Sequence, residues 1–334
     1  MTPNPITSIH ASIGDGALPE LRELRYFAAV AEELSFTRAA SRCGVGQSAL
    51  SQSVAQLEAR LGVALFDRGE RRVRLTPAGE VLLDRAKRAI AAAREAAEAM
   101  EPFSGGGAGR LRVGVVQTVN ALAVPQVVGE LARRFPAARF DVRELPAAGV
   151  EELVATGDLD LGVGFHPVAR PTLELQPLAR EEILLIEWRG RGGPVPVVGA
   201  GDLAGRALVL LAPAFCTRRL VDAAFAEHGV RLDPTVETNS VEGALAMVRG
   251  NGFATLLPEM ALRTHAGAGL SGSRIEGVPI SRRLLLLWRR NGYRSPLAAH
   301  FAEELKRLLE AQPADSPSSQ PPKAARPRRR SDSP

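Results

Sequence analysis

Short polar side chains gather on one side of the stretch Ser35–Leu61, where they could hydrogen-bond to DNA bases. These residues are Gln47, Ser48, Ser51, Gln52 and Gln56. Amide and hydroxyl groups both donate and accept hydrogen bonds, which is the chemistry that reads base edges in a major groove. Apolar residues recur on the other side at helical steps of four, three and four: Leu50, Val54, Leu57 and Leu61. The pattern predicts a groove-reading helix, although a helical hairpin inside a larger core fits it equally well.

A second helix is predicted just before this one, and a tight turn joins the two. Its apolar side consists of Phe36, Ala39, Ala40 and Cys43. Small side chains at such a contact let two crossed helices approach closely. Gly44 can take the left-handed conformation that ends a helix, and Gly46 stands where a helix cap is expected. Three residues at the start of this helix are also assigned to DNA contact: Ser35, Thr37 and Arg38.

A basic hairpin is predicted after the two helices. Residues 66–68 and 73–75 are short strand candidates around a tip at residues 69–72. Four arginines lie on this ribbon: Arg68, Arg71, Arg72 and Arg74. Guanidinium groups suit phosphate oxygens and narrow minor grooves, so we interpret the ribbon as a DNA-binding wing. A solvated basic turn is the alternative.

Thr76 and Pro77 predict the start of a long helix that runs to about Met100, because threonine caps helices and proline is tolerated in the first turn. Small apolar residues recur along it at coiled-coil steps of four and three: Leu82, Ala86, Ala89, Ala93 and Ala96. This seam favours pairing with a second copy of the chain. Such a pair would hold two groove-reading helices about 34 Å apart and predicts a pseudo-palindromic DNA site.

The composition is that of a soluble globular protein. Of 334 residues, 45% are hydrophobic and 24% charged, and the formal net charge of +5 is compatible with a nucleic-acid partner. Two cysteines, Cys43 and Cys216, cannot form a disulfide framework. No apolar run approaches the roughly 20 residues of a membrane span. We therefore expect a cytoplasmic protein with no membrane segment.

Beyond residue 109 the pattern changes to alternating strands and helices. Apolar strands are predicted at 111–116, 139–144, 159–165, 207–212, 253–257 and 283–288. Helices are predicted at 122–135, 218–228, 241–249 and 295–309, and a further short helix is predicted to end at residue 156. Continuous apolar strands that alternate with helices indicate a mostly parallel sheet covered on both faces.

In such sheets ligands bind beyond the carboxyl ends of the strands, and helix amino termini there favour small anions. The residues at these places are Gln117, Thr118, Asn120, His166, Pro213, Phe215 and Thr217. We expect them to line an effector pocket, with the threonines as hydroxyl donors and Phe215 as an apolar wall. Alternatively, both threonines are ordinary helix caps and His166 is structural.

From about residue 21 to about residue 312 the chain resembles the LysR-type transcriptional regulators. The densest part is residues 24–83, LRYFAAVAEELSFTRAASRCGVGQSALSQSVAQLEARLGVALFDRGERRVRLTPAGEVLL. The resemblance implies an N-terminal all-α winged helix-turn-helix domain, a long dimerisation helix and a C-terminal α/β effector domain. The effector domain would have two lobes, like periplasmic binding proteins, with the chain crossing between them near 182–187 and again near 263–275.

The expected boundaries follow from this resemblance and from local composition. They are 1–20 disordered, 21–76 DNA-binding, 77–101 linker and dimerisation helix, 102–109 hinge, 110–312 effector-binding and 313–334 a disordered basic tail. Within the effector domain, lobe I is expected at about 110–183 and 267–312, and lobe II at about 184–266.

The resemblance also implies a function. It implies a homodimer or a dimer of dimers (a tetramer) that binds double-stranded promoter DNA, contacts RNA polymerase and responds to a small, anionic effector held between the lobes. Thr118 matches a position where the family commonly places a serine or threonine that touches effector. At Ala147 this chain lacks the hydroxyl of several aromatic-acid responders. The effector half looks most like activators of cyanate-degradation operons, with aromatic-catabolism regulators as the alternative.

The sequence shows no motif that would indicate another class of function. The five histidines are scattered, and no nucleotide-binding glycine loop or nucleophile turn occurs, so we expect no enzyme, no cofactor and no metal. An enzyme with a helical dimerisation unit, or a ligand-binding protein that does not touch DNA, are the alternatives. A thiol at a helix start, as at Cys216, can have a lowered pKa, but the effector domain has no second cysteine to resolve a sulfenic acid.

Overall fold

The computed structural model describes residues 18–67, 73–100, 109–165, 170–189, 198–203 and 205–310. The predictions for Arg68, Arg71, Arg72 and His166, for residues 1–17 of the N-terminal segment, for residues 102–108 of the hinge and for the tail at 313–334 lie outside these residues. The chain forms two compact units. The first is Met1–Glu181 with Arg282–Leu305, and the second is Glu182–Ser281 with the residues from Lys306 onward.

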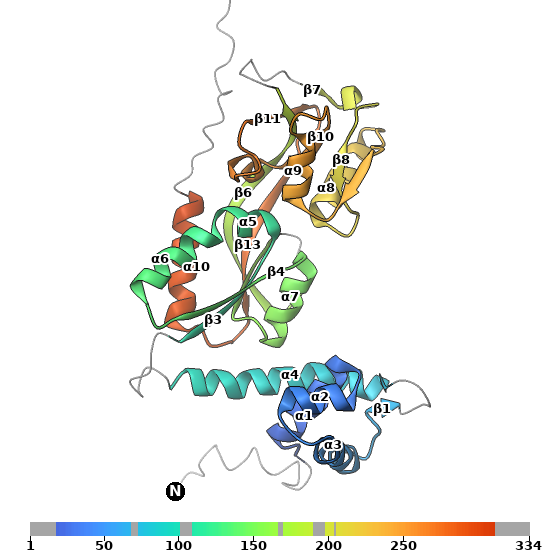
Figure 1. Cartoon of the computed structure of the whole chain (residues 1–334), viewed down its shortest axis with the longest axis vertical. Helices are drawn as coiled ribbons and strands as arrows, with labels where there is room; N and C mark the ends of the chain where they lie inside the picture. The colour runs from blue at the N-terminus through green and yellow to red at the C-terminus, as the bar shows by residue number, and fades with distance from the viewer. Residues whose placement is uncertain are drawn as a thin grey trace, which may run out of the picture. The chain divides into compact units, whose positions relative to one another are not determined.

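Three helices begin the first unit: α1 (Leu21–Glu33), α2 (Phe36–Cys43) and α3 (Gln47–Leu61) (Figure 1). A capping box starts α1, where the carboxylate of Glu23 accepts a hydrogen bond from the backbone N–H of Glu20 at 2.8 Å. Gly44 ends α2 with a φ of 68°, and Gly46 precedes α3 without a side-chain cap. The predicted helix-turn-helix is confirmed, and its turn depends on the left-handed conformation that glycine adopts without strain.

The core of this helical part is apolar and aromatic. Phe27, Leu50 and Leu57 are fully buried, and the ring of Phe27 lies 5.4 Å from that of Phe66. Val54 is also fully buried, and Leu61 packs partly buried against the same core. The apolar face predicted for the second helix of the pair is therefore confirmed.

A short ribbon and a long helix follow. Strands β1 (Phe66–Asp67) and β2 (Arg74–Leu75) pair antiparallel. Helix α4 (Pro77–Glu98) begins where predicted, because the hydroxyl of Thr76 accepts a hydrogen bond from the backbone N–H of Gly79 at 3.1 Å.

Lobe I, the α/β part of the first unit, is built on parallel strands. Its elements in chain order are β3 (Arg110–Val115), α5 (Gln117–Leu122), α6 (Val124–Arg134), β4 (Arg139–Glu144), α7 (Ala147–Thr156) and β5 (Leu161–Phe165). Strand β3 pairs parallel with both β4 and β5. The helix predicted at 122–135 is confirmed as α6, in which Pro125 lies in the first turn, where a missing N–H is tolerated. The short helix α5 before it was not predicted.

Two long strands belong partly to each unit. Strand β6 (Leu173–Trp188) passes the unit boundary at Glu181, and β13 (Ser281–Arg289) begins at the return boundary. In lobe I, β13 pairs antiparallel with β5, and α10 (Pro296–Glu310) follows it. Sequence reasoning did not predict β6 as a strand.

The second unit is lobe II. Its elements are β7 (Val198–Gly199), η4 (Ala200–Leu203), β8 (Val209–Leu211), α8 (Cys216–Glu227), β9 (Val236–Thr238), α9 (Val241–Val248), β10 (Ala254–Pro258), η5 (Glu259–Arg263), β11 (Leu270–Ser273) and β12 (Ile275–Glu276). Strands β8 and β9 pair parallel, whereas β10 and β11 pair antiparallel with β6.

The second crossing between the lobes, predicted near 263–275, is corrected to Ser281–Arg282. Residues 263–275 remain in lobe II, where β11 and β12 form. Strand β11, with the sequence LSGS, is short and contains serine and glycine, so its composition resembles that of a linker. In the described part of the chain, no helix is long and apolar enough to span a bilayer.

Candidate DNA interface and effector site

Helix α3 presents its predicted polar residues to solvent. Gln47, Ser48, Gln52 and Gln56 are exposed and Ser51 is half-buried. The hydroxyl of Thr37 donates a hydrogen bond to Oε1 of Gln47 at 2.9 Å, which joins the start of α2 to the start of α3. A row of exposed amide and hydroxyl groups on a helix held in this way can reach base edges in a major groove.

The other predicted DNA contacts at the start of α2 have structural partners. The hydroxyl of Ser35 accepts a hydrogen bond from the backbone N–H of Arg38 at 3.4 Å and caps α2. The exposed guanidinium of Arg38 lies 3.3 Å from the carboxylate of Glu33. Of the four arginines predicted on the wing, Arg74 is described and is exposed on β2.

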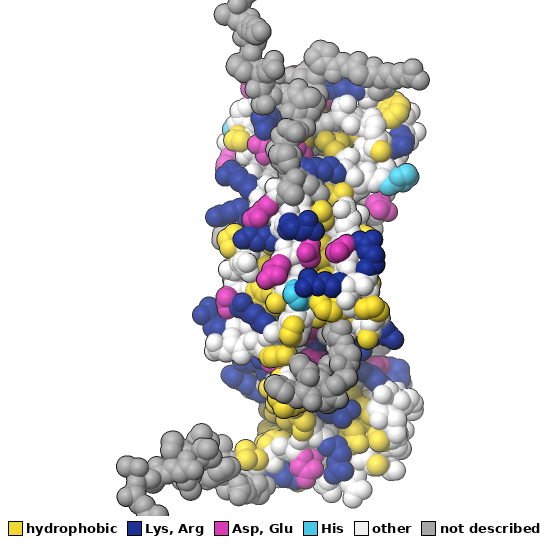
Figure 2. Space-filling model, turned by 90° about the vertical axis from the view of Figure 1, so that its left-hand side faces the viewer, with side chains coloured by type: hydrophobic (Ala, Val, Ile, Leu, Met, Phe, Trp, Pro, Cys, Tyr) yellow, Lys and Arg dark blue, Asp and Glu magenta, His cyan; other side chains and the backbone are white. Residues whose placement is uncertain are grey.

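The distribution of charge does not by itself mark a DNA surface. Basic and acidic side chains are intermixed on the face shown in Figure 2. The formal charge of +5 is therefore not gathered on that face, and the argument for DNA rests on the geometry of α2 and α3.

Helix α4 does not present the predicted seam as one exposed face. Ala86 is fully buried and Leu82 partly buried against the core of α1 to α3, so these two residues are corrected to core residues. Ala89 and Ala96 are exposed, and Ala93 is half-buried. The exposed apolar face of α4 consists of Val81, Ala89, Ala92 and Ala96, and Met100 continues it in the turn after the helix. The periodicity identified an apolar helix but could not show that one side of it packs on α1.

In lobe I, the predicted effector residue Thr118 belongs to a buried polar cluster. Its side chain lies at the start of α5 and is 3% exposed. Arg282, at the start of β13, donates from Nη2 to the hydroxyl of Thr118 at 2.6 Å and from Nε to the carboxylate of Glu181 at 2.8 Å. The guanidinium also lies 4.4 Å from the ring centre of Phe165.

Sequence reasoning missed Arg282 and Glu181. Each is a charged residue beside an apolar run that forms a strand, and such residues are usually exposed at strand ends. Here both side chains are buried, at 2% and 6% exposure, because β6 and β13 carry them into lobe I. The only signal in the sequence was a charged residue next to an apolar run.

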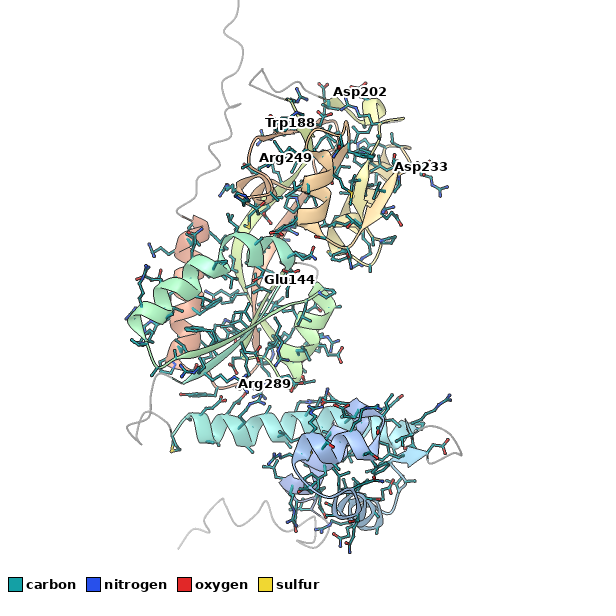
Figure 3. All side chains as sticks on the ribbon, viewed as in Figure 1. Glu144, Trp188, Asp202, Asp233, Arg249 and Arg289 are labelled. Atoms are coloured by element: carbon teal, nitrogen blue, oxygen red, sulfur yellow. The ribbon has the colours of Figure 1, made fainter. Side chains whose placement is uncertain are left out.

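Two other predicted residues of lobe I lie beside this cluster in the chain. Asn120 donates from Nδ2 to the carboxylate of Glu144 at 2.9 Å and so ties α5 to β4. Gln117 is half-buried at the first residue of α5. Asn120 of α5 thus binds the carboxyl end of β4, which Glu144 marks in Figure 3.

In lobe II, the predicted residues lie around the start of α8. Pro213 is exposed, and Thr217 is 5% exposed. Phe215 precedes the helix and packs against the lobe II core, so it is a core residue as much as a pocket wall. Cys216 is half-buried at the first residue of the helix.

A cavity of about 800 Å³ lies elsewhere on lobe II, and none of the predicted residues lines it. Its charged lining includes Arg218, Asp222 and Glu237. The guanidinium of Arg218 is already bound by both carboxylates, at 2.8 Å and 2.6 Å. The cavity therefore offers an anion no uncompensated positive charge among these three groups.

Two family models match the chain. The bacterial regulatory helix-turn-helix protein model of the LysR family matches residues 21–80. The LysR substrate binding domain matches residues 104–310. The first match covers α1 to α3, the wing and the start of α4, and the second covers both lobes.

Individual regulators are also similar to this chain over most of its length. The uncharacterized HTH-type transcriptional regulator YfeR of Shigella flexneri is 34% identical over 276 residues, which are 81% of this chain and 88% of that protein. The HTH-type transcriptional regulator EstR of Acinetobacter baylyi is 31% identical over 288 residues, 85% of this chain and 94% of its own. A full-length OxyR variant of Pseudomonas aeruginosa has a similar structure, with a TM-score of 0.65 and 26% identity over 87% of this chain and 94% of its own.

The structure and the matches give the same assignment along most of the chain. Both indicate a helix-turn-helix part followed by two α/β lobes. The curated relatives are transcriptional regulators, and the fold is that of full-length regulators of the same kind. The protein belongs to the LysR family of DNA-binding transcriptional regulators, with a helix-turn-helix domain and an effector-binding domain.

Proposed function

We propose that this regulator binds a pseudo-palindromic promoter site as a homodimer or a dimer of dimers, and that a small anionic molecule controls its activity. The exposed polar row of α3 carries the proposal. Its residues Ser48, Gln52 and Gln56 recur at steps of four, so they lie along one line of the helix. A line of amides and a hydroxyl matches the donor and acceptor pattern of base edges.

The exposed apolar face of α4 supports self-association. Val81 is 67% exposed and Met100 is 57% exposed, with alanines between them on the same side. Exposed apolar side chains of this size on a long helix are typical of a surface that a second copy covers. Two-fold pairing would place two α3 helices on successive major grooves.

The effector proposal rests on the lobe I cluster. Arg282 orients the hydroxyl of Thr118 but is itself paired with Glu181, so the hydroxyl, and not a free positive charge, is the group proposed to hydrogen-bond a carboxylate or a smaller anion. Thr118 of lobe I and Thr217 of lobe II are the proposed effector contacts, and an effector that binds one state of the regulator preferentially would shift the population of states. A cyanate-like anion and an aromatic-catabolism metabolite are the two classes to compare. The proposed regulator also contacts RNA polymerase and acts in the cytoplasm. The proposal includes no catalytic activity.

A binding assay with one glutamine variant tests the DNA proposal. Fluorescence anisotropy would measure affinity for the intergenic DNA upstream of the gene and for an unrelated fragment, with Gln52→Ala and with a control, Gln126→Ala. Gln126 is an exposed glutamine of α6. We expect Gln52→Ala to weaken specific binding by about 5- to 150-fold, since a good base contact contributes about 1–3 kcal/mol, and to leave nonspecific binding unchanged.

Other outcomes would change the conclusion. Equal losses on both DNA fragments would remove Gln52 from base recognition. Absence of DNA binding by the unmodified protein would favour a ligand-binding protein that does not touch DNA. A thermal-shift comparison with cyanate and with benzoate then tests the effector class, because a ligand that binds the folded state raises its melting temperature.

A further inference from the structure

The side chain of Gln47 is held by one hydrogen bond at the point where α2 and α3 begin. Thr37 is the second residue of α2, and Gln47 is the first residue of α3. The hydroxyl of Thr37 donates to Oε1 of Gln47 at 2.9 Å, and both side chains are exposed. Within the part of the chain that the structure describes, Thr37 is the only polar partner of the Gln47 side chain. The amide oxygen therefore faces Thr37, and the two N–H bonds of Nε2 face away from it.

The core fixes the backbone on both sides of this hydrogen bond. Phe36, which precedes Thr37, packs against the core of α1 to α3, and its ring lies 5.7 Å from that of Phe66. Leu50, one turn after Gln47, is fully buried in the same core. The two helix starts are thus held in place from inside the domain, and the hydrogen bond sets how the exposed amide of Gln47 is turned.

The electrostatic field at this point favours the same orientation of the amide. The first N–H groups of a helix have no partner within the helix, and the positive end of its dipole lies there. Two helices begin beside the Gln47 amide, and Gly46 offers α3 no side-chain cap. Because the oxygen is the negative end of an amide group, it is favoured on the side of the helix starts. The N–H groups are then favoured on the outer side.

An amide whose oxygen is engaged in this way offers DNA only donors. A free glutamine reads adenine with both of its groups, because its oxygen accepts from N6 and its nitrogen donates to N7. Guanine presents acceptors at O6 and N7 and thymine presents one at O4, whereas the exocyclic nitrogens of adenine and cytosine donate. A side chain that only donates therefore favours guanine or thymine.

On the basis of the proposed DNA-binding function, we propose that Thr37 determines base specificity by making Gln47 a donor-only reader of guanine or thymine. Thr37 acts through Gln47, so it is a positioning residue whose role requires no contact with a base. The hydroxyl holds the amide oxygen, and Nε2 donates to the exocyclic oxygen of the base in the major groove.

The other two glutamines of the α3 row provide an internal comparison. Gln52 and Gln56 are exposed, and among the described residues no side chain fixes either amide. Each can turn its oxygen or its nitrogen towards a base. A substitution of Thr37 should therefore change the base preference at the position that Gln47 reads and leave the positions of Gln52 and Gln56 unchanged.

The first experiment reverses the chemistry of the reading group. In vitro selection from a random DNA library with the full-length protein measures the base preference at each position of the site, and Gln47→Ala identifies the position that Gln47 reads. Gln47→Glu keeps an oxygen for Thr37 but offers DNA an acceptor in place of the donors. We expect the preference at that position to change, on one strand, from guanine or thymine to cytosine or adenine, by about 5- to 150-fold, the range of a good base contact.

Two outcomes of this experiment would overturn the proposal. A glutamine that reads adenine with both groups would still select adenine or cytosine as Gln47→Glu, because the acceptor is retained. An unchanged class of base in this variant would therefore show that the amide oxygen was available to DNA. If Gln47→Ala changes no position, the side chain contacts the DNA backbone, and the proposal fails while sequence-specific binding stands.

The second experiment removes the positioning group. Thr37→Val has nearly the same shape but no hydroxyl, and Thr37→Ser keeps the hydroxyl. We expect Thr37→Val to shift the preference at the Gln47 position towards adenine by about 2- to 12-fold, the effect of one net hydrogen bond, and Thr37→Ser to retain the original preference. Positions identified by Gln52→Ala and Gln56→Ala serve as the control and should not change.

The remaining outcomes separate the proposal from its alternatives. An unchanged preference in Thr37→Val would overturn it, and so would an equal loss at all positions, because a merely structural or phosphate-binding role acts on every sequence alike. The comparison of Gln47→Glu with the unmodified protein does not depend on the folding of any Thr37 variant. If the unmodified protein selects no sequence at all, the proposed DNA-binding function fails, and the role of Thr37 fails with it.

Discussion

Nη2 of Arg282 donates to the hydroxyl of Thr118 across 2.6 Å, and both side chains are buried. The residue that the sequence marks as an effector contact is therefore also part of the structure of lobe I. Arg282 is bound on its other side by Glu181, at 2.8 Å. An effector that reaches Thr118 would meet a hydroxyl whose orientation the guanidinium already sets.

This relationship predicts different effects for two substitutions of Thr118. Thr118→Val removes an acceptor of Arg282 and should lower the free energy of unfolding by about 1–3 kcal/mol, the usual cost of losing a partner of a buried polar group. Thr118→Ser keeps the acceptor and should cost less. Urea denaturation measures both. In a thermal-shift assay, the serine variant should keep the stabilisation by whichever anion stabilises the unmodified protein, and the valine variant should lose it. A valine variant that responds normally would place the effector elsewhere.

A Cβ added at Gly157, where φ is 81°, would lie 2.4 Å from the Cβ of Ala91, so we expect a steep cost for alanine at position 157. Gly157→Ala adds about 1–2 kcal/mol for left-handed backbone and about 1–3 kcal/mol for overpacking. The matched control is Gly205→Ala, which has a φ of 80° but no atom within 4 Å of its added Cβ. We expect the control to lose only the backbone part in urea denaturation. Adding Ala91→Gly to the Gly157→Ala variant should recover the overpacking part, and equal losses in all variants would show that the contact does not form in solution.

The raised pKa of Glu98 predicts a pH dependence of stability. Because burial raises this pKa above the ordinary 4.5, the folded state binds the proton more readily than the unfolded state. The contribution of Glu98 is fully present below pH 4.5 and is lost as the pH rises through the raised value. Glu98→Gln should therefore flatten the profile of unfolding free energy in that window.

A carboxylate with the opposite shift provides the comparison. The hydrogen bond from Arg143 lowers the pKa of Asp141 from the ordinary 3.8. Its contribution is present above that value and is lost as the pH falls through the lowered one. Asp141→Asn should remove stability at neutral pH, whereas Glu98→Gln should not. Chemical denaturation between pH 3 and pH 7 would separate them, and changes of the same sign in both variants would contradict the assignment for Glu98.

The exposed apolar face of α4 predicts which alanine disrupts self-association. Ala92→Glu places a charge on that face and should weaken the dimer by about tenfold or more, since burying an unpaired charge costs several kcal/mol. Ala93→Glu, at a half-buried seam position, should act less on the dimer. Sedimentation equilibrium measures both, with Gln126→Glu on α6 as the control. If Ala93→Glu weakened the dimer more than Ala92→Glu, the dimer contact would lie along the seam that the periodicity indicates.

Local sequence determined the parts of this protein that local physics controls. Thr76 and Pro77 start α4 because a hydroxyl and a missing N–H suit the first turn of a helix, and Gly44 ends α2 because glycine takes positive φ without strain. The spacing of the apolar residues of α3 predicted its buried face, because residues three and four apart share one side of a helix. The pattern of residues 24–83 is by itself sufficient to indicate the family.

Only the tertiary structure decided which distant residues meet. Glu181 and Arg282 are 101 residues apart in the chain, and their pairing depends on how β6 and β13 pass through lobe I. Ala86 belongs to the apolar pattern of α4, yet it is buried because α1 lies against it. Gly157 and Ala91 carry no chemical signal and meet only through the packing of α7 and α4. The spacing of residues in a segment indicates the conformation of that segment. Contacts between distant residues depend on the chain topology, which no single segment contains.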